Sequence, residues 1–201
     1  MNPTAVVFDV GNVLYRWDPD FLFRKLIPGA DERRWFLDNV ITLEWHAQHD
    51  AGRALDPMIA ERKAQFPDSS DLIDAYRDRW LETIPGPVPG VHDLVERLAT
   101  RGVPLYAITN FGTEFWARFV PTAPVLDHFG DIVVSGDVEM MKPDPRIFAL
   151  ALDRFGLEAG EAVFIDDIEA NVAASDAAGF VGHHFTDAET LERDLSDKGL
   201  L

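Results

Sequence analysis

The chain has 201 residues and carries 35 acidic against 18 basic side chains, which gives a formal net charge of −17 at pH 7. A field of this sign repels nucleic acids and anionic membrane surfaces, so we expect neither as a partner. Hydrophobic residues make up 47% of the sequence, enough to bury one substantial core. No cysteine is present, which excludes disulfides, thiolate catalysis and cysteine metal sites.

Short continuous apolar runs recur along the chain. They occupy residues 5–8, 103–108, 132–134, 162–165 and 180–181. Runs of this kind are typical of parallel strands that are buried on both faces. Helical patterns that end at a glycine lie at residues 91–101, 143–155 and 167–178. Strands that alternate with helices predict an α/β fold with a Rossmann-like, doubly wound parallel sheet.

Residues from about 19 to 84 interrupt this alternation. They contain helical stretches rich in tryptophan, phenylalanine, leucine and charge, with no convincing strand. The segment 85–90 reads Pro-Gly-Pro-Val-Pro-Gly, which is a linker composition. We therefore expect residues 1–18 and 85–201 to form the catalytic core, and residues 19–84 to form an inserted helical cap domain.

Polar side chains follow the predicted strands at the points where the strands end. They are Asp9, Thr109 with Asn110, Lys142, and Asp166 with Asp167. Asp9 or Thr109 alone could cap a turn, and Lys142 alone could be a solvated surface charge, whereas the pair Asp166-Asp167 is harder to explain in this way. Ligands of open parallel sheets bind outside the carboxyl ends of the strands, so we expect these side chains to converge. Convergent polar groups favour a functional site over a structural role.

The order of these residues resembles the four motifs of the haloacid dehalogenase-like hydrolase superfamily. The matching segments are Phe8-Asp9-Val10-Gly11-Asn12, Thr109-Asn110, Lys142-Pro143 and Asp166-Asp167. They span nearly the whole chain, and the helical insertion after the first segment resembles the cap of that superfamily. The Gly-Asn-Val form of the first motif, together with residues 45–52, resembles bacterial sugar-phosphate phosphatases that act on glucose 1-phosphate.

The resemblance implies a Mg²⁺-dependent phosphatase in which Asp9 attacks the phosphoryl group and forms an aspartyl-phosphate that water hydrolyses. Mg²⁺ prefers hard oxygen ligands, which Asp9 and Asp166 can supply. Adjacent carboxylates behind a buried strand repel one another unless a cation or donor lies nearby, and this also favours a metal at Asp166 and Asp167. By resemblance, the backbone carbonyl of Gly11 is a further ligand.

Positive charge and hydrogen-bond donors complete the expected site. Lys142 is expected to hold Asp9 ionised and to bind phosphoryl oxygens, and the Thr109 hydroxyl adds a donor. We therefore assign Thr109 and Lys142 to catalysis and to substrate binding. Asn110 and the cap residue His46 are assigned to substrate binding.

Gly11 departs from the superfamily pattern, in which a second aspartate at this position protonates the leaving oxygen. Loss of a general acid costs roughly 10²- to 10⁴-fold in rate. Asp18, His46 and His49 are candidates to replace it. The departure leaves two alternatives open: a 2-haloacid dehalogenase that uses Asp9 on carbon, and a catalytically weak binding or regulatory protein.

The substrate class is expected to be a small phosphorylated metabolite, and the sequence identifies neither that metabolite nor the oligomeric state. The apolar run near the N-terminus is too short for a signal sequence or a membrane span. With the absence of cysteine, this favours a cytoplasmic location.

Overall fold

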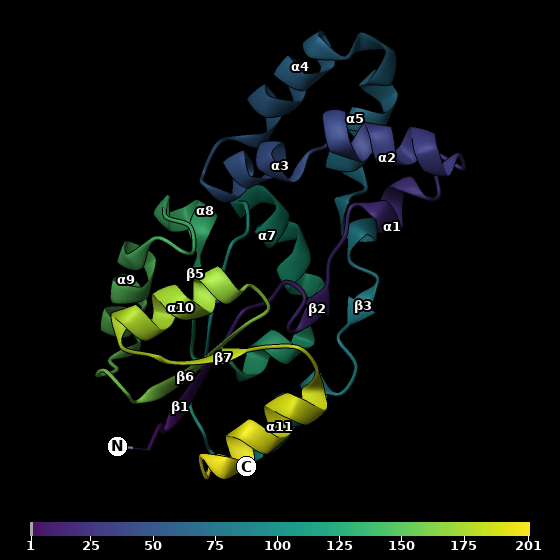
Figure 1. Cartoon of the computed structure of the whole chain (residues 1–201). Helices are drawn as coiled ribbons and strands as arrows, with labels where there is room; N and C mark the ends of the chain where they lie inside the picture. The colour runs from purple at the N-terminus through teal and green to yellow at the C-terminus, as the bar shows by residue number, and fades with distance from the viewer. Residues whose placement is uncertain (1) are drawn as a thin grey trace.

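The structure is a computed structural model that describes residues 2–201, and its centre is a five-stranded parallel sheet (Figure 1). The strands are β1 (Ala5–Phe8), β4 (Leu105–Thr109), β5 (Asp131–Val134), β6 (Ala162–Asp166) and β7 (Val181–His184). Their order across the sheet is β5-β4-β1-β6-β7, so β1 lies in the middle. The predicted α/β fold with a Rossmann-like parallel sheet is confirmed.

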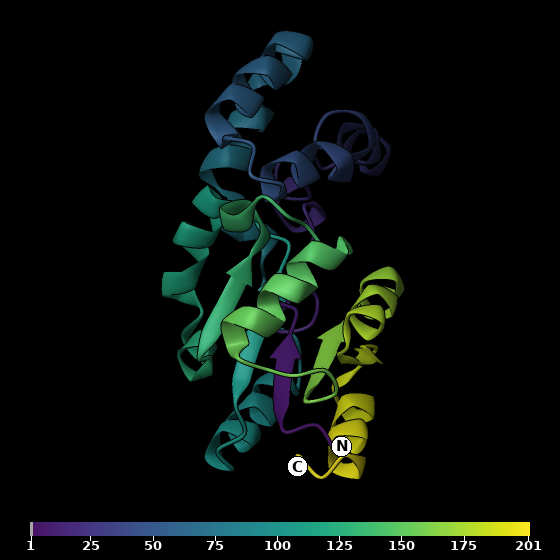
Figure 2. The ribbon, with the colours of Figure 1, turned by 90° about the vertical axis from the view of Figure 1, so that its left-hand side faces the viewer.

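Helices cover both faces of the sheet (Figure 2). Successive side chains of each strand point to opposite sides, so the continuous apolar strands need a cover on both faces. Val6 and Phe8 belong to the hydrophobic cluster that includes α6 (Val91–Thr100) and α11 (Ala188–Asp197). Ala5 and Val7 belong to a second cluster, which includes α9 (Pro145–Phe155). α10 (Glu169–Ala178) packs beside α9 on this second face. The sheet is therefore buried on both sides, as its continuous apolar runs predict.

The segment expected to interrupt the alternation is helical and lies beyond the carboxyl ends of the strands (Figure 1). Its elements are α1 (Asp20–Phe23), α2 (Ala30–Asn39), α3 (Leu43–Asp50), α4 (Leu55–Gln65), η1 (Pro67–Ser69), α5 (Ser70–Asp78) and η2 (Trp80–Thr83). We call residues 20–83 the helical insertion. The remaining helices are α7 (Thr113–Phe119), η3 (Val120–Thr122), η4 (Pro124–His128) and α8 (Ser135–Val138).

A short antiparallel ribbon connects the helical insertion to the rest of the chain. It pairs β2 (Tyr15–Arg16) with β3 (Gly86–Pro87). The proline content of residues 85–90 predicts a linker, and the structure places a strand within it. The expected domain boundaries at residues 18 and 85 lie next to this ribbon, and the division into two domains stays a prediction.

The helical insertion packs closely against the edge of the sheet. Trp80 of η2 stacks on Phe115 of α7, with ring centroids 4.4 Å apart and an interplanar angle of 10°. Gly112 lies so near α3 that a Cβ atom there would stand 2.0 Å from the imidazole of His49. The contact requires glycine, because an alanine methyl group needs roughly 3.5 Å to a neighbouring carbon.

One hydrogen-bonded link fixes the end of α3 to the sheet. The Ser135 hydroxyl, directly after β5, donates to the backbone carbonyl of Asp50 over 2.6 Å. The same oxygen accepts from the backbone amide of Phe111 over 2.9 Å. Ser135 is fully buried, so this link is shielded from water and holds the last turn of α3 over the strand ends.

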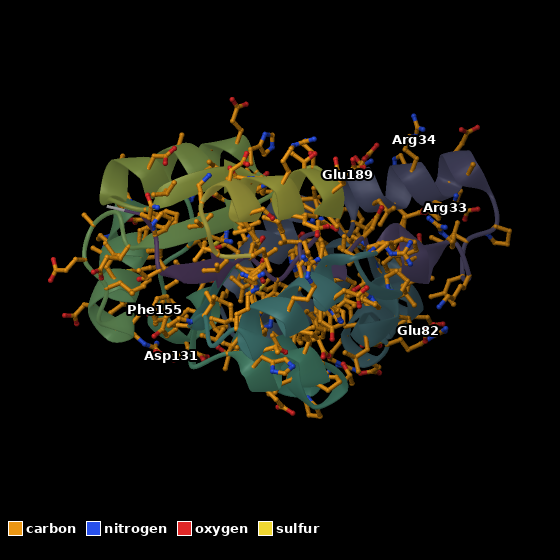
Figure 3. The ribbon with its side chains drawn as sticks, turned by 90° about the horizontal axis from the view of Figure 1, so that it is seen from below. Arg33, Arg34, Glu82, Asp131, Phe155 and Glu189 are labelled. Carbon is orange, nitrogen blue, oxygen red and sulfur yellow. The ribbon has the colours of Figure 1, made fainter. Side chains whose placement is uncertain are left out.

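Charged side chains lie at the periphery, as Arg34 and Glu189 do when the molecule is viewed from below (Figure 3). Among the helices of residues 2–201, none is long and apolar enough to span a bilayer.

Candidate active site

The centre of the site is a buried lysine bound between two aspartates. The Nζ of Lys142 lies 2.9 Å from Oδ1 of Asp9 and 2.7 Å from Oδ2 of Asp166. It also donates to the backbone carbonyl of Ile108 over 2.8 Å. Asp9 follows β1 and Asp166 ends β6, and these neighbouring strands pair Phe8 with Ile165. The register of the sheet therefore brings both carboxylates to the same ammonium group.

Hydrogen bonds orient each of these groups. Asp166 accepts from the side-chain amide of Asn171 over 3.0 and 3.1 Å, and from the backbone amide of Ile168 over 2.8 Å. Asp9 accepts from the backbone amide of Val10 over 2.7 Å. Asn171 thus supports the site from α10.

Asn110 fixes the loop that carries Lys142. Its side chain donates to the Lys142 carbonyl over 3.0 Å and accepts from the Lys142 amide over 2.8 Å. This reciprocal pair ties the end of β4 to the segment before α9. Lys142 is 3% exposed, and these bonds set the direction in which its side chain enters the interior.

The charges of the site strongly perturb one another. Burial alone would lower the pKa of Lys142, but Asp9 and Asp166 outweigh it and raise that pKa, so the side chain is a cation. Burial raises the pKa of Asp9, Lys142 opposes this change, and Asp166 adds to it. Asp167 has a raised pKa for the same reasons, burial first and Asp166 second. One cation therefore stands against three carboxylates.

This excess of negative charge fits a divalent metal ion. Asp9, Asp166 and Asp167 each offer an oxygen atom, and these atoms lie within 4.8 Å of one another. Oxygen donors at such separations suit a hard cation, and its charge would offset the repulsion that raises the pKa values of Asp9 and Asp167. The residues present therefore fit the expected metal.

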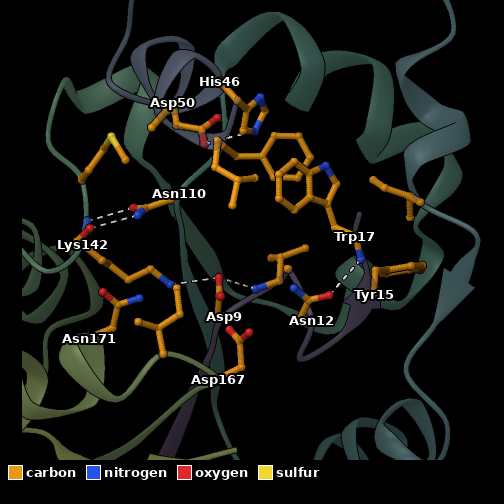
Figure 4. A pocket seen from close by; sticks show the side chains of 18 of the residues that line it. Asp9, Asn12, Tyr15, Trp17, His46, Asp50, Asn110, Lys142, Asp167 and Asn171 are labelled. Atoms are coloured by element: carbon orange, nitrogen blue, oxygen red, sulfur yellow. Dashed lines mark hydrogen bonds and ion pairs between the residues drawn. The ribbon is translucent and has the colours of Figure 1, made fainter. Parts of the chain in front are cut away.

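A cavity of about 260 Å³ opens above these carboxylates (Figure 4). Its floor includes Asp9, Lys142 and Asp167, and its opposite side includes His46 and Asp50 of α3. Aromatic and aliphatic side chains form much of the wall between them, namely Trp17, Leu43, Trp80, Ile84 and Phe111. The cavity therefore has a charged end on the sheet and a smaller polar end on the helical insertion.

Most of the predicted site residues meet at this cavity. Those that line it are Asp9, Gly11, His46, Asn110, Lys142 and Asp167. Asp166 lies immediately beneath, fully buried and bonded to Lys142. Thr109 is buried at the end of β4 and does not line the cavity, so its assigned role stays a prediction.

Two of the three candidates for the replacement acid lie outside the cavity. Asp18 is exposed and accepts from the backbone amide of Asp20. His49 is buried, but its Nδ1 bonds to the carbonyl of Arg53 and its ring packs on Gly112. Their placement does not favour either residue as the replacement acid. For His49, helical spacing alone does not show which face of α3 meets the cavity.

Gly11 leaves open space beside Asp9. A Cβ atom built on it would meet no heavy atom within 4 Å, and its φ lies outside the positive range. A side chain is therefore tolerated at this position. Steric hindrance does not explain why the sequence has glycine there and no acid.

Sequence reasoning missed Asp50, which lines the cavity and is 6% exposed. Burial raises its pKa to about 7, while His49 and the backbone amide of Gly112 oppose the rise. Its neighbour His46 is also buried, which lowers the imidazole pKa to about 3. Asp50 lies four residues after His46, so helical periodicity over α3 would have placed both side chains on one face of the helix.

The fold and the site together define an α/β protein with an acidic, lysine-containing centre at the carboxyl ends of a parallel sheet. The chain belongs to the haloacid dehalogenase-like hydrolase family, whose model matches residues 3–179.

Individual relatives agree with this assignment. A phosphoglycolate phosphatase of Yersinia pseudotuberculosis is 31% identical over 87% of this chain and 77% of its own length. A ribulose-1,5-bisphosphate 5-phosphatase of Halopiger xanaduensis is 27% identical over 88% and 82%. A crystal structure of a family enzyme from Bacteroides thetaiotaomicron, in complex with magnesium and inorganic phosphate, superposes with a TM-score of 0.72 at 21% identity. That match covers 92% of this chain and 95% of the other.

The burial of Asp50 predicts a pH-dependent effect of Asp50→Asn on stability. The carboxyl pKa is about 7 in the folded chain against an ordinary 3.8, so folding takes up a proton between these values. Ionisation of Asp50 therefore destabilises the wild type as pH rises through this window, and asparagine carries no such cost. We expect Tm of Asp50→Asn, relative to wild type, to increase by on the order of 5 °C between pH 5 and pH 8.

The exposed Glu44 on the same helix supplies the control. Glu44→Gln removes one carboxylate as well, so the comparison separates the effect of the buried Asp50 from a general loss of charge. Thermal unfolding in the presence of a chelator measures both variants. A flat profile for Asp50→Asn would show that Asp50 ionises normally.

Proposed function

We propose that this protein is a Mg²⁺-dependent phosphoric monoester hydrolase that acts on a small phosphorylated metabolite, with a sugar phosphate as the candidate substrate. The observation that carries the proposal is the Asp9 carboxylate at the floor of the cavity, paired with the buried Lys142 and adjoining Asp166 and Asp167. The phosphatase names of the two relatives support it.

In the proposed reaction, a carboxylate oxygen of Asp9 forms a bond to phosphorus while the bond from phosphorus to the ester oxygen breaks. The leaving oxygen takes up a proton and departs as an alcohol. Water then attacks the aspartyl-phosphate and releases inorganic phosphate, which restores the Asp9 carboxylate. Burial raises the pKa of Asp9 to about 7, and Lys142 opposes this rise and so favours the ionised nucleophile. Lys142 also faces the phosphoryl oxygens as a fixed positive charge.

Asp9, Asp166 and Asp167 would hold Mg²⁺, with the backbone carbonyl of Gly11 as a further oxygen ligand. When bound, the ion supplies positive charge that offsets the charge of the phosphoryl group. Asn171 keeps Asp166 oriented toward the site through two hydrogen bonds, so its contribution to metal affinity is indirect.

Protonation of the leaving group is the weak point of this site. Gly11 supplies no acid, and the lowered pKa of His46 keeps its imidazole neutral at pH 7. We therefore propose that the enzyme favours esters whose leaving oxygen needs little protonation, such as sugar 1-phosphates, acyl phosphates or aryl phosphates.

The dehalogenase alternative is less well supported by the geometry. Attack on carbon needs no metal, yet three carboxylate oxygens lie within 4.8 Å of one another around a single lysine. A purely binding role would leave this costly cluster of buried charges without a use.

Asp9→Asn should lower phosphate release by about 10³-fold or more, because an amide is a poor nucleophile of nearly the same shape. Release of inorganic phosphate from p-nitrophenyl phosphate with Mg²⁺ provides the measurement, and circular dichroism checks the fold. Asp18→Asn, at an exposed position outside the cavity, is the matched control and should retain full activity. Turnover above a few per cent in Asp9→Asn would show that Asp9 is not the nucleophile.

Removal of the metal should abolish phosphate release, and added Mg²⁺ should restore it. Asp166→Asn should raise the Mg²⁺ concentration needed for half-maximal activity by about 10-fold or more, because one ligand charge is lost from a hard-cation site. A titration of activity against Mg²⁺ measures this shift. Full activity in excess chelator would remove the metal from the proposal.

Gly11→Asp should restore the missing acid, because the position has room for a side chain. Turnover of alkyl phosphates should rise by about 10-fold or more, with little change for p-nitrophenyl phosphate, whose leaving group needs no proton. Gly11→Asn has the same shape without the acid and should give no gain. Equal gains for both esters would contradict the proposed dependence on the leaving group.

A further inference from the structure

The end of the cavity formed by α3 carries two polar side chains within a largely apolar wall. His46 and Asp50 face the cavity from successive turns of the helix, with Nε2 of His46 3.3 Å from Oδ2 of Asp50 (Figure 4). Trp17 stacks on the His46 ring at 4.8 Å with an interplanar angle of 25°. Any leaving group of a substrate held at Asp9 would extend toward these side chains, because they lie across the cavity from the phosphoryl site.

A hydrogen-bond network fixes the direction of His46. The Tyr76 hydroxyl lies 2.6 Å from its Nδ1, and burial raises the pKa of Tyr76 well above its ordinary value. The hydroxyl therefore keeps its proton and donates it to Nδ1 of a neutral imidazole. The ring proton is then on Nε2, which points at Asp50. His46 thus acts as a donor without a net charge.

Asp50 presents one of its two oxygens to the cavity. Oδ1 is buried and out of reach of an occupant, and the backbone amide of Gly112 lies beside the carboxylate. Because Asp50 lines the cavity, Oδ2 is the oxygen that an occupant can reach, and it lies 3.3 Å from Nε2 of His46. A hydroxyl group is suited to this position because it can donate to Oδ2 and accept from the Nε2 proton of His46.

Positive charge is scarce in the cavity. Within the part of the chain that the structure describes, Lys142 is the only lysine or arginine that lines it. That ammonium is already bound to Asp9, Asp166 and the Ile108 carbonyl at the opposite end. An anionic group at the α3 end would therefore meet Asp50 with no cation to compensate.

We propose that Asp50, with His46, determines substrate specificity: the pair binds a hydroxyl group of a neutral leaving group and excludes leaving groups that carry a carboxylate. This inference rests on the proposed phosphatase function. It implies that phosphoglycolate, the substrate named for the Yersinia relative, is a poor substrate for this chain, because its leaving group would place a second negative charge beside Asp50.

Two esters that differ in a single group test the proposal. 2-Hydroxyethyl phosphate and phosphoglycolate have the same carbon count and differ in carrying CH₂OH or COO⁻, and ethyl phosphate carries neither. Phosphate release is measured with Mg²⁺ at pH 8 for each ester, with p-nitrophenyl phosphate as a reference. For the wild type we expect kcat/KM for 2-hydroxyethyl phosphate to exceed that for phosphoglycolate by about 10-fold or more.

Variants of Asp50 separate the two parts of the proposal. Asp50→Asn removes the charge but keeps a hydrogen-bonding group, so it should raise kcat/KM for phosphoglycolate by about 10-fold. Asp50→Ala removes both the charge and the hydrogen-bonding group, so kcat/KM for 2-hydroxyethyl phosphate should fall toward the value for ethyl phosphate. Glu44→Gln loses the same charge on the same helix outside the cavity and should leave every ratio unchanged.

The outcomes are distinguishable. A wild type that releases phosphate but prefers phosphoglycolate, or an Asp50→Asn variant with an unchanged ratio, would overturn the role of Asp50 and leave the phosphatase function standing. No phosphate release from any ester, the aryl phosphate included, would refute the phosphatase function and the specificity inference with it.

Discussion

The site depends on one interaction, the buried ammonium of Lys142 between Asp9 and Asp166. Isolated charges of either sign would be too costly in this interior, and the pair of contacts makes each of them tenable. The sheet enforces the contact, because the register of β1 and β6 places the two aspartates side by side. Asn110 and Asn171 then hold the lysine loop and Asp166 in place, so much of the polar chemistry beneath the cavity serves to position this ion cluster.

The two ends of the cavity are electrostatically different for a structural reason. The sheet end collects charged groups because parallel strands terminate there, and the α3 end is a helix face that presents one histidine and one acid. Burial moves the pKa values of these two residues toward neutral forms, His46 to about 3 and Asp50 to about 7. In the proposed function, the chemistry and the recognition of the leaving group therefore fall to different layers of the fold.

The sequence was sufficient to predict the parallel sheet, because most of its strands, each of four or five residues, coincide with short apolar runs that need no tertiary information to recognise. Asp9, Lys142 and the aspartate pair were predicted because strand ends of one sheet converge by topology. The β2–β3 ribbon was missed, since its pairing joins residues about 70 positions apart within a proline-rich segment. The spacing of four residues places Asp50 on the same face of α3 as His46, but which face meets the cavity follows from long-range contacts at Gly112 and Ser135, which leave no local signature.

The hydrogen bond from Ser135 to the carbonyl of Asp50 has a consequence for how this molecule can be re-engineered. Exchanging residues 20–83 as a block would separate α3 from Ser135, which anchors it, and from Gly112, whose missing side chain makes room for His49. α3 therefore forms one structural unit with the sheet and its adjoining loops, although in the sequence it lies among the helices of the insertion. A graft that keeps residues 43–50 together with Gly112 and Ser135, and varies only α2, α4 and α5, preserves the contacts that hold α3 over the strand ends.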